Sequence, residues 1–133
     1  MEEQKKTSSE NLVKATCVIQ MKLPSLNDLI NAERTNRFIG AKMKRNTQDG
    51  IAWFIKSLPK FEKPVKIHFH WIEKTSRRDL DNISSAGRKF ILDALVENGK
   101  LKDDSQKYVK GFTDTFEKGK ENEVVVTIEE VNE

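Results

Sequence analysis

The sequence has few of the residues that cross-link a protein or anchor it in a membrane. Its 133 residues include one cysteine, Cys17, and two histidines. One cysteine excludes an internal disulfide and any cysteine-based zinc site, and two histidines add too few ligands for a structural zinc ion. No apolar stretch approaches the ~18 residues of a membrane span, and residues 1–14 lack the hydrophobic centre of a secretion signal. We therefore expect a cytoplasmic protein without a membrane attachment.

Charge is abundant and unevenly distributed along the chain. Charged residues make up 34% of the sequence, with a net charge of +3. Residues 22–66 contain ten Lys or Arg against four acidic residues, whereas residues 117–133 contain six Glu and two Lys. A strongly basic half is typical of proteins that bind a polyanion, with nucleic acid the first candidate. The alternative is a solvated surface whose charge is simply unequal.

The hydrophobic pattern predicts an α/β protein of the α+β type, with elements in the order β-α-β-α-β-β. Strands are expected at residues 12–23, 65–72, 108–116 and 124–131, and a helix at residues 36–58. A second helix begins at an Asp and ends before Gly99, and its apolar residues recur at helical spacing from Ile83 to Leu95. We expect a small mixed sheet of about four strands with two main helices.

Residues 12–133 are expected to form a single domain, preceded by a disordered polar arm at residues 1–11. Pro24 ends the first expected strand, and Ser25 or Asn27 is a candidate cap for the next segment of the chain. The chain contains no internal repeat and no low-complexity segment.

The segment 77–82, with the sequence RRDLDN, carries two carboxylates two residues apart, Asp79 and Asp81. In an extended segment such residues point the same way, roughly 6.5–7 Å apart. Hard divalent cations such as Mg²⁺ prefer oxygen ligands, often carboxylates together with phosphate oxygens. A second acidic pair, Asp103 and Asp104, precedes the third strand. If that strand lies beside the second, all four carboxylates can meet at one sheet edge, where nearby basic residues suit a phosphate backbone.

These acidic residues also have simpler explanations. An Asp-x-Asp pair is common, and Asp79 or Asp81 is also a candidate helix cap. A calcium-binding EF-hand loop is excluded, because its Gly and Glu positions are occupied by Ser84 and Phe90. The chain also lacks a G-x-x-x-x-G-K-[ST] phosphate loop, and we expect no small-molecule cofactor.

Two further groups of polar residues allow more than one interpretation. His68 and His70 share a strand face, but no third metal ligand of matching kind is evident, so a polar sheet face is the preferred interpretation. The run Lys42-Met43-Lys44-Arg45 is either a solvated helix face or a contact to phosphates.

The motifs together resemble the RusA family of Holliday junction resolvases. They are RRDLDNI at residues 77–83, KFILDAL at residues 89–95, Gly99, and Asp103-Asp104. The segment LPSLN at residues 23–27, with Asn31 and Arg34, is also similar. The resemblance covers roughly residues 15–131. It implies a small homodimeric α/β endonuclease, often carried by phages and prophages, that uses Mg²⁺ or Mn²⁺ to make paired nicks in four-way DNA junctions.

The resemblance also implies which residues act. The catalytic and metal-binding carboxylates map onto Asp79, Asp81 and Asp104. A family lysine stands four residues after the second Asp in shorter members, where this chain has Ser85. The chain carries about one extra helical turn, so counting back from the later DAL motif gives Lys89, with Arg88 the neighbouring candidate. The residues expected to contact DNA are Lys42, Lys44, Arg45, Lys74, Arg77, Arg78, Asn82 and Arg88.

The expected function is a Mg²⁺-dependent endodeoxyribonuclease of the bacterial cytoplasm that resolves four-way junctions in recombination and repair, with Mn²⁺ able to substitute. Two symmetric cuts call for two active sites and hence a homodimer. The alternative from another class is a non-catalytic DNA-binding or regulatory protein on the same fold. The three carboxylates favour the enzyme, because a pure binder gains nothing from acids beside phosphate. The same chemistry leaves an RNA nuclease open.

Overall fold

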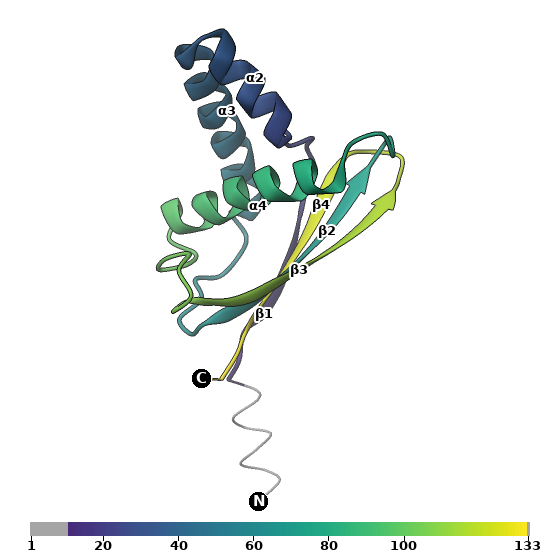
Figure 1. Ribbon diagram of the computed structural model, residues 1–133. Coiled ribbons are helices and arrows are strands. Elements are labelled where there is room, and N and C mark those ends of the chain that lie inside the picture. The colour runs from purple at the N-terminus through teal and green to yellow at the C-terminus, as the bar shows by residue number, and fades with distance from the viewer. Residues whose placement is uncertain (1–10, 133) are drawn as a thin grey trace, which may run out of the picture.

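Four strands and three helices make up the computed structural model, which describes residues 11–132 (Figure 1). The expected disordered arm therefore lies, apart from Asn11, outside the described residues. The elements are β1 (Lys14–Ile19), α2 (Leu26–Thr35), α3 (Arg37–Ile55), β2 (Val65–Glu73), α4 (Leu80–Glu97), β3 (Val109–Lys118) and β4 (Glu123–Glu130). The α+β class and the four-stranded mixed sheet are confirmed, but the expected two main helices are three.

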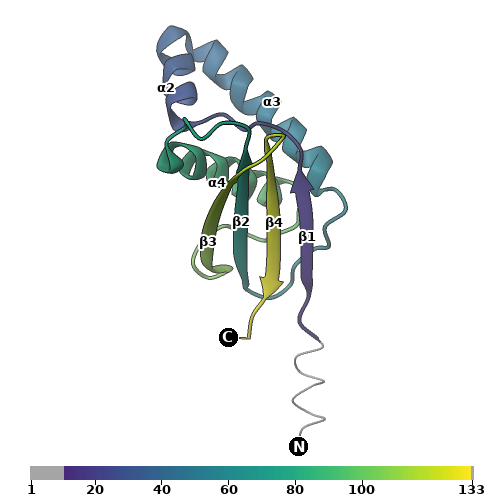
Figure 2. The same ribbon diagram turned by 90° about the vertical axis from the view of Figure 1, so that its right-hand side faces the viewer.

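The sheet has the strand order β1-β4-β2-β3. β4 runs antiparallel to both β1 and β2, whereas β2 and β3 are parallel. A parallel pair requires a crossover, and α4 provides it by running back along the sheet between the two strands. The helices lie on one side of the sheet and leave the other face open (Figures 1 and 2).

The core lies between the sheet and α4. Alternate residues of β2 are buried, as the period of two predicts for a strand with one covered face; they are Val65, Ile67, Phe69 and Trp71. They meet the apolar stripe of α4, which includes Ile83, Phe90, Ile91 and Leu95. Gly87 allows close approach here, because a Cβ at that position would lie 2.5 Å from Cη2 of Trp71.

The missed helix is the first half of a helical hairpin. Ser25 caps α2 in a capping box: its hydroxyl accepts from Asp28 N at 3.2 Å, and Asp28 Oδ2 accepts from Ser25 N at 2.9 Å. Asn36 then adopts an extended conformation and separates α2 from α3, while its Oδ1 accepts from Phe38 N at 2.7 Å. The hairpin of α2 and α3 projects beyond the sheet (Figure 1). None of the helices between residues 11 and 132 is both long and apolar enough to cross a bilayer.

Candidate active site

Asp79 and Asp81 lie where β2 passes into α4. Asp79 is the N-cap of α4, and its Oδ1 accepts a hydrogen bond from Asp81 N at 2.9 Å. Asp81 belongs to the first helical turn, so the expected extended Asp-x-Asp segment is wrong and the capping interpretation of Asp79 is confirmed. Both side chains are exposed, and the N-terminal end of the helix dipole favours their negative charge.

Asp103 and Asp104 lie at the opposite end of the same helix. α4 has 18 residues and is therefore about 27 Å long. Because β2 and β3 are parallel, α4 must return the full length of the sheet before β3 begins. The expectation that all four carboxylates meet at one sheet edge is therefore wrong for a single chain. No three His, Cys, Asp or Glu side chains within residues 11–132 are grouped so that they could hold a metal ion.

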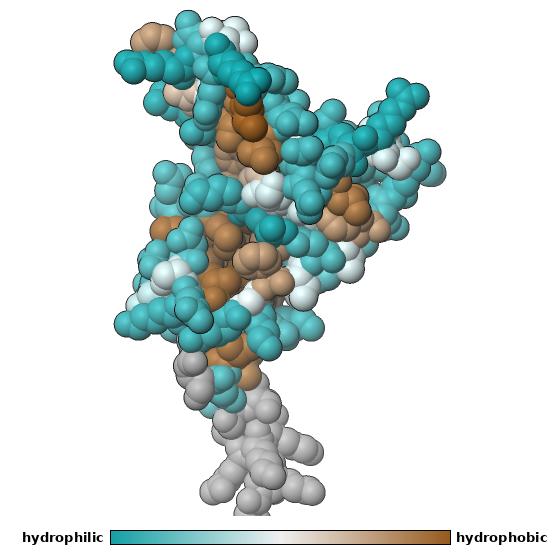
Figure 3. Space-filling model, in the orientation of Figure 1, coloured by the Kyte–Doolittle hydropathy of each residue, from teal (hydrophilic) through white to brown (hydrophobic). Residues whose placement is uncertain are grey.

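A cleft of about 880 Å³ lies between the helical hairpin and α4. Its lining includes Leu26, Leu29, Lys44, Gln48, Ser85, Lys89, Asp93 and Asp104. Hydrophobic side chains, coloured brown, are visible along the hairpin above α4, with hydrophilic residues around them (Figure 3). The cleft thus brings the expected catalytic residues Lys89 and Asp104 to one surface, together with Lys44. The i,i+4 spacing of Lys89 and Asp93 already put Asp93 on the same helix face, whereas no sequence pattern indicated Gln48.

Lys89 and Arg88 occupy different environments, although they are adjacent in the chain. The Lys89 side chain is 70% exposed, and its Nζ lies 3.3 Å from Asp93 Oδ1. Arg88 turns toward the sheet, where its guanidinium pairs with Asp114 and lies 4.6 Å from the centroid of the Phe112 ring. Lys89 therefore faces the cleft, and Arg88 is occupied in a structural contact.

Asp114 connects Arg88 to the core. Its Oδ1 accepts a hydrogen bond from Trp71 Nε1 at 2.9 Å, while Oδ2 receives the Arg88 guanidinium. Both members of the ion pair are largely buried, with 22% and 19% of their side chains exposed. The pair therefore joins α4 to β3 and satisfies the one polar atom of the buried Trp71 indole.

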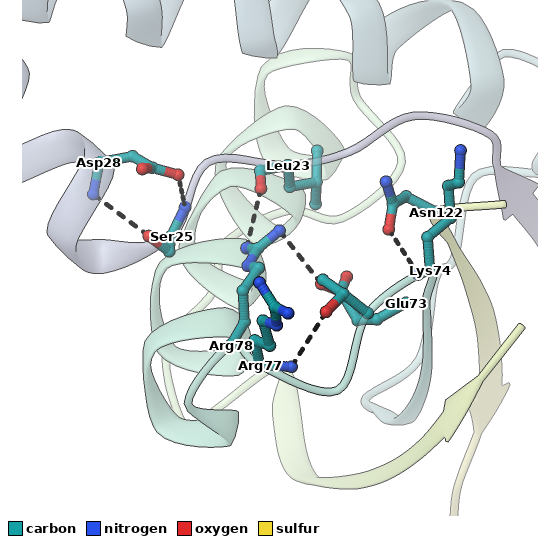
Figure 4. Close-up of polar contacts among 9 residues, drawn as sticks. Leu23, Ser25, Asp28, Glu73, Lys74, Arg77, Arg78 and Asn122 are labelled. Atoms are coloured by element: carbon teal, nitrogen blue, oxygen red, sulfur yellow. Dashed lines mark hydrogen bonds and ion pairs between the residues drawn. The ribbon is translucent and has the colours of Figure 1, made fainter.

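Arg78 is held inside the loop that carries Asp79 (Figure 4). Its Nη1 lies 3.2 Å from Glu73 Oε1, and its Nη2 donates to the Leu23 carbonyl at 3.1 Å. Only 15% of the Arg78 side chain and 12% of the Glu73 side chain are exposed. Burial raises the pKa of Glu73 above its ordinary value, and the charges of Arg78 and Lys22 oppose that rise. This contact fastens the Asp79 loop to the segment that leads into α2, so Arg78 is placed to position the loop.

Sequence reasoning missed the role of Glu73, although a signal was present. Glu73 continues the alternate, inward-facing residues of β2, and a carboxylate in such a buried row requires a cationic partner.

The other expected DNA contacts form two exposed groups. Lys74 and Arg77 lie on the Asp79 loop, where Lys74 N donates to Asn122 Oδ1 at 2.9 Å and Arg77 N donates to Thr75 Oγ1 at 3.2 Å. Lys42, Lys44 and Arg45 lie on α3, where Lys44 Nζ is 3.1 Å from Glu33 Oε1. Asn82 is half-buried in the first turn of α4.

His68 and His70 form part of a hydrogen-bonded row on the open sheet face. His68 contacts the hydroxyls of Thr113 and Thr115, at 2.5 and 2.9 Å. His70 contacts Thr115 Oγ1 at 2.5 Å and Glu117 Oε1 at 2.7 Å. The preferred interpretation of a polar sheet face is confirmed.

Comparison with known families gives a match to the family described as Endodeoxyribonuclease RusA, over residues 31–129. The matched span includes α3, the Asp79 loop, α4 and Asp104. Comparison with curated proteins finds no match.

Proposed function

Because the chain belongs to the RusA family of endodeoxyribonucleases, we propose that it is a Mg²⁺-dependent resolvase that cuts four-way DNA junctions by paired nicks. Residues 12–133 act as one nuclease domain, which works as a homodimer. The observation that carries the proposal is the state of Asp79, Asp81 and Asp104. All three are exposed, and none of the ion pairs among the described residues involves them. All three carboxylates are therefore accessible to a cation.

The donor set fits a hard divalent cation. Asp79 and Asp81 lie next to each other at the start of α4 and offer oxygen ligands, which Mg²⁺ and Mn²⁺ accept. Bound Mg²⁺ would lower the pKa of a water and neutralise charge on the scissile phosphate. Asp79 and Asp81 would hold the ion, and the bond from Asp81 N to Asp79 Oδ1 orients the Asp79 carboxylate before DNA binds.

A second copy of the chain completes the site. Asp104 lies in the loop beyond the far end of α4, a helix about 27 Å long, and within one chain it forms no metal-binding group with Asp79 and Asp81 among the described residues. In a two-fold dimer each protomer uses the same surface, so a contact from one end of α4 to the other end of the partner's α4 occurs twice. Asp79 and Asp81 of each protomer can therefore be joined by the partner's Asp104. This arrangement gives two equivalent sites, one for each strand that is cut.

The basic residues take separate roles in this proposal. Lys89 faces the cleft and stabilises the negative charge that develops on the phosphate. The DNA backbone is bound without sequence readout by Lys74 and Arg77 on the loop and by the Lys42–Arg45 run on α3, with Asn82 beside them. Arg78 positions the loop through Glu73 and Leu23, as Figure 4 illustrates.

Nicking of a synthetic four-way junction tests the proposal. The wild-type protein should cut the junction with Mg²⁺ and not with EDTA, and should leave a linear duplex of the same sequence intact. Asp81→Asn should abolish cutting while junction affinity stays the same or rises, because affinity comes from Lys and Arg. Asp49→Asn is the matched control, since Asp49 is also an exposed helical carboxylate but lies on α3. Full activity of Asp81→Asn would exclude the metal site, and binding without any Mg²⁺-dependent cutting would identify a non-catalytic binder.

A further inference from the structure

The turn between α2 and α3, residues 34–38, forms a projecting tip (Figure 1). We call it the hairpin tip. Asn36 N donates to Ala32 O at 3.1 Å and its side chain caps α3, so a single extended residue joins the two helices. Thr35 Oγ1 also donates to Asn31 O at 2.9 Å. These bonds fix the direction of the tip, which points away from the sheet (Figure 1).

The hairpin tip presents an aromatic ring to solvent. Phe38 is 75% exposed, the most exposed of the large hydrophobic residues between residues 11 and 132, and Ile39 beside it is 47% exposed. The ring contact found for Phe38 within the described residues is with its neighbour Arg37, whose guanidinium carbon lies 5.9 Å from the ring centroid. A single exposed apolar residue needs no explanation by itself, so the surroundings of Phe38 decide what it does.

The surroundings of Phe38 are strongly basic. Residues 33–45 contain five Lys or Arg and one acidic residue, Glu33. Glu33 neutralises one of the five, Lys44, through their ion pair. Arg37 lies against the ring, and Arg34 belongs to the last turn of α2. An exposed aromatic ring in such a basic segment suits single-stranded nucleic acid, because bases stack on the ring while phosphates pair with the cations. A protein partner with an apolar surface would gain nothing from these charges.

We propose that Phe38 stacks on a base at the branch point of the junction, where the stacking between the arms is interrupted, and that Arg34 and Arg37 bind the phosphates beside it. This inference rests on the proposed function, since a branched DNA is the substrate that offers bases without a stacked neighbour, whereas the stacked bases of a linear duplex are closed to Phe38. Apolar side chains inserted at a base step unstack it and bend the DNA. The hairpin tip thus gives the protein a means to select branched over linear DNA.

The fold couples the hairpin tip to the candidate active site. Arg78, one residue before Asp79, donates to the carbonyl of Leu23, and Ser25 begins α2 two residues later. The ten residues of α2 then place the tip about 15 Å from Ser25. The stacked base and the scissile phosphate are thereby held at a set separation, although no side chain of the tip takes part in catalysis.

Junctions that carry 2-aminopurine at each branch-point position report this stacking, because its fluorescence rises when the base leaves the stack. Binding is measured without divalent ions, so that the strands stay uncut. The wild-type protein should raise the fluorescence at a branch-point position, and Phe38→Ala should abolish the rise and weaken junction binding by about fivefold to a hundredfold. Affinity for a linear duplex should change less than about twofold. Phe38→Trp should restore both signals, because tryptophan also stacks.

Trp53→Ala is the matched control for Phe38→Ala. Trp53 is likewise exposed, at 69%, lies on α3, and has a cation 5.1 Å from its ring, the Nζ of Lys56. It lies at the other end of the helix, so its loss should leave the fluorescence rise and the junction affinity unchanged.

Three results would overturn the stacking role. The first is wild-type protein that binds and cuts the junction without any fluorescence rise, and the second is a Phe38→Ala variant with wild-type junction affinity. The third is a Phe38→Ala dimer that dissociates into single chains in light scattering, which would assign Phe38 to a protein contact. Junction binding and a fluorescence rise without Mg²⁺-dependent cutting would instead refute the nuclease proposal and support the stacking. A wild-type protein that does not bind junctions at all would refute both.

Discussion

Mixing two inactive variants is expected to restore cleavage. Asp81→Asn removes a carboxylate at one end of α4, and Asp104→Asn removes one beyond the other end of this helix, which is about 27 Å long. If each site of a two-fold dimer combines both ends, one site of the mixed dimer receives both substitutions and the other receives neither. The mixed dimer therefore keeps one intact site, although each variant alone has none.

The size of the recovered activity is set by the number of intact sites. Random association of equal amounts places about half of the dimers in the mixed form, and each of these has one intact site out of two. The mixture should therefore nick junctions at about a quarter of the wild-type rate for the same total protein. Because a mixed dimer cuts one strand, the product should be a nicked junction and not a pair of resolved duplexes. Denaturing and native gels distinguish the two products.

The control for this experiment is a mixture of Asp81→Asn with Asp79→Asn. These residues lie at the same end of α4, so every site in every dimer lacks one of them and the mixture should stay inactive. Light scattering should give about twice the 15.3 kDa chain mass for each variant. If mixed dimers form and bind junctions but the Asp81→Asn and Asp104→Asn mixture remains inactive, the site does not combine two chains and the reasoning is refuted.

Three other substitutions separate chemistry from folding. Lys89→Ala should slow nicking by roughly a hundredfold with little change in melting temperature, because its exposed contact with Asp93 contributes only a few tenths of a kcal/mol. Arg88→Ala should instead lower the free energy of unfolding by about 2 kcal/mol, since it leaves Asp114 without its cation. A nicking defect in a folded Arg88→Ala protein would show that Arg88, and not Lys89, acts on the phosphate. Glu130→Gln should cost about 2 kcal/mol, because the buried Glu130 carboxylate accepts three backbone hydrogen bonds. Burial alone would raise the pKa of Glu130, but these bonds lower it below the ordinary 4.5. The Glu130 carboxylate therefore contributes to the free energy of unfolding at pH values above 4.5. This contribution is lost as the pH falls through the lowered pKa of the folded state, so the melting temperatures of wild type and Glu130→Gln should converge in acid.

The sequence predicted the elements whose patterns are strong and local. The alternation of β2 and the apolar stripe of α4 each repeat over many residues, and both elements appear where they were expected. α2 was missed because a candidate cap at Ser25 was not connected to its capping-box partner, Asp28. The interruption between α2 and α3 at Asn36 was also missed, because an asparagine inside a helical pattern does not by itself predict an extended backbone.

The arrangement of the candidate site depended on contacts that no local pattern contains. Placing Asp104 requires knowing that β2 and β3 are parallel, because that pairing sends α4 back to the other end of the sheet. Separating Lys89 from Arg88 requires knowing that Asp114 of β3 lies beneath α4. Adjacent basic residues look equivalent in the sequence, and only their distant partners distinguish them.

If the site combines two chains as proposed, the placement of Asp79 and Asp104 beyond opposite ends of α4 makes protein concentration a control on the enzyme. A lone chain holds two of the three carboxylates at one end of α4 and the third at the other, so a newly made protomer carries no complete site among its described residues. Below the dissociation constant of the dimer, the rate of cutting should rise with the square of the protein concentration, and above it in direct proportion. Dilution would therefore switch the chemistry off, and a cell containing a few stray chains would be spared unscheduled breaks in its DNA.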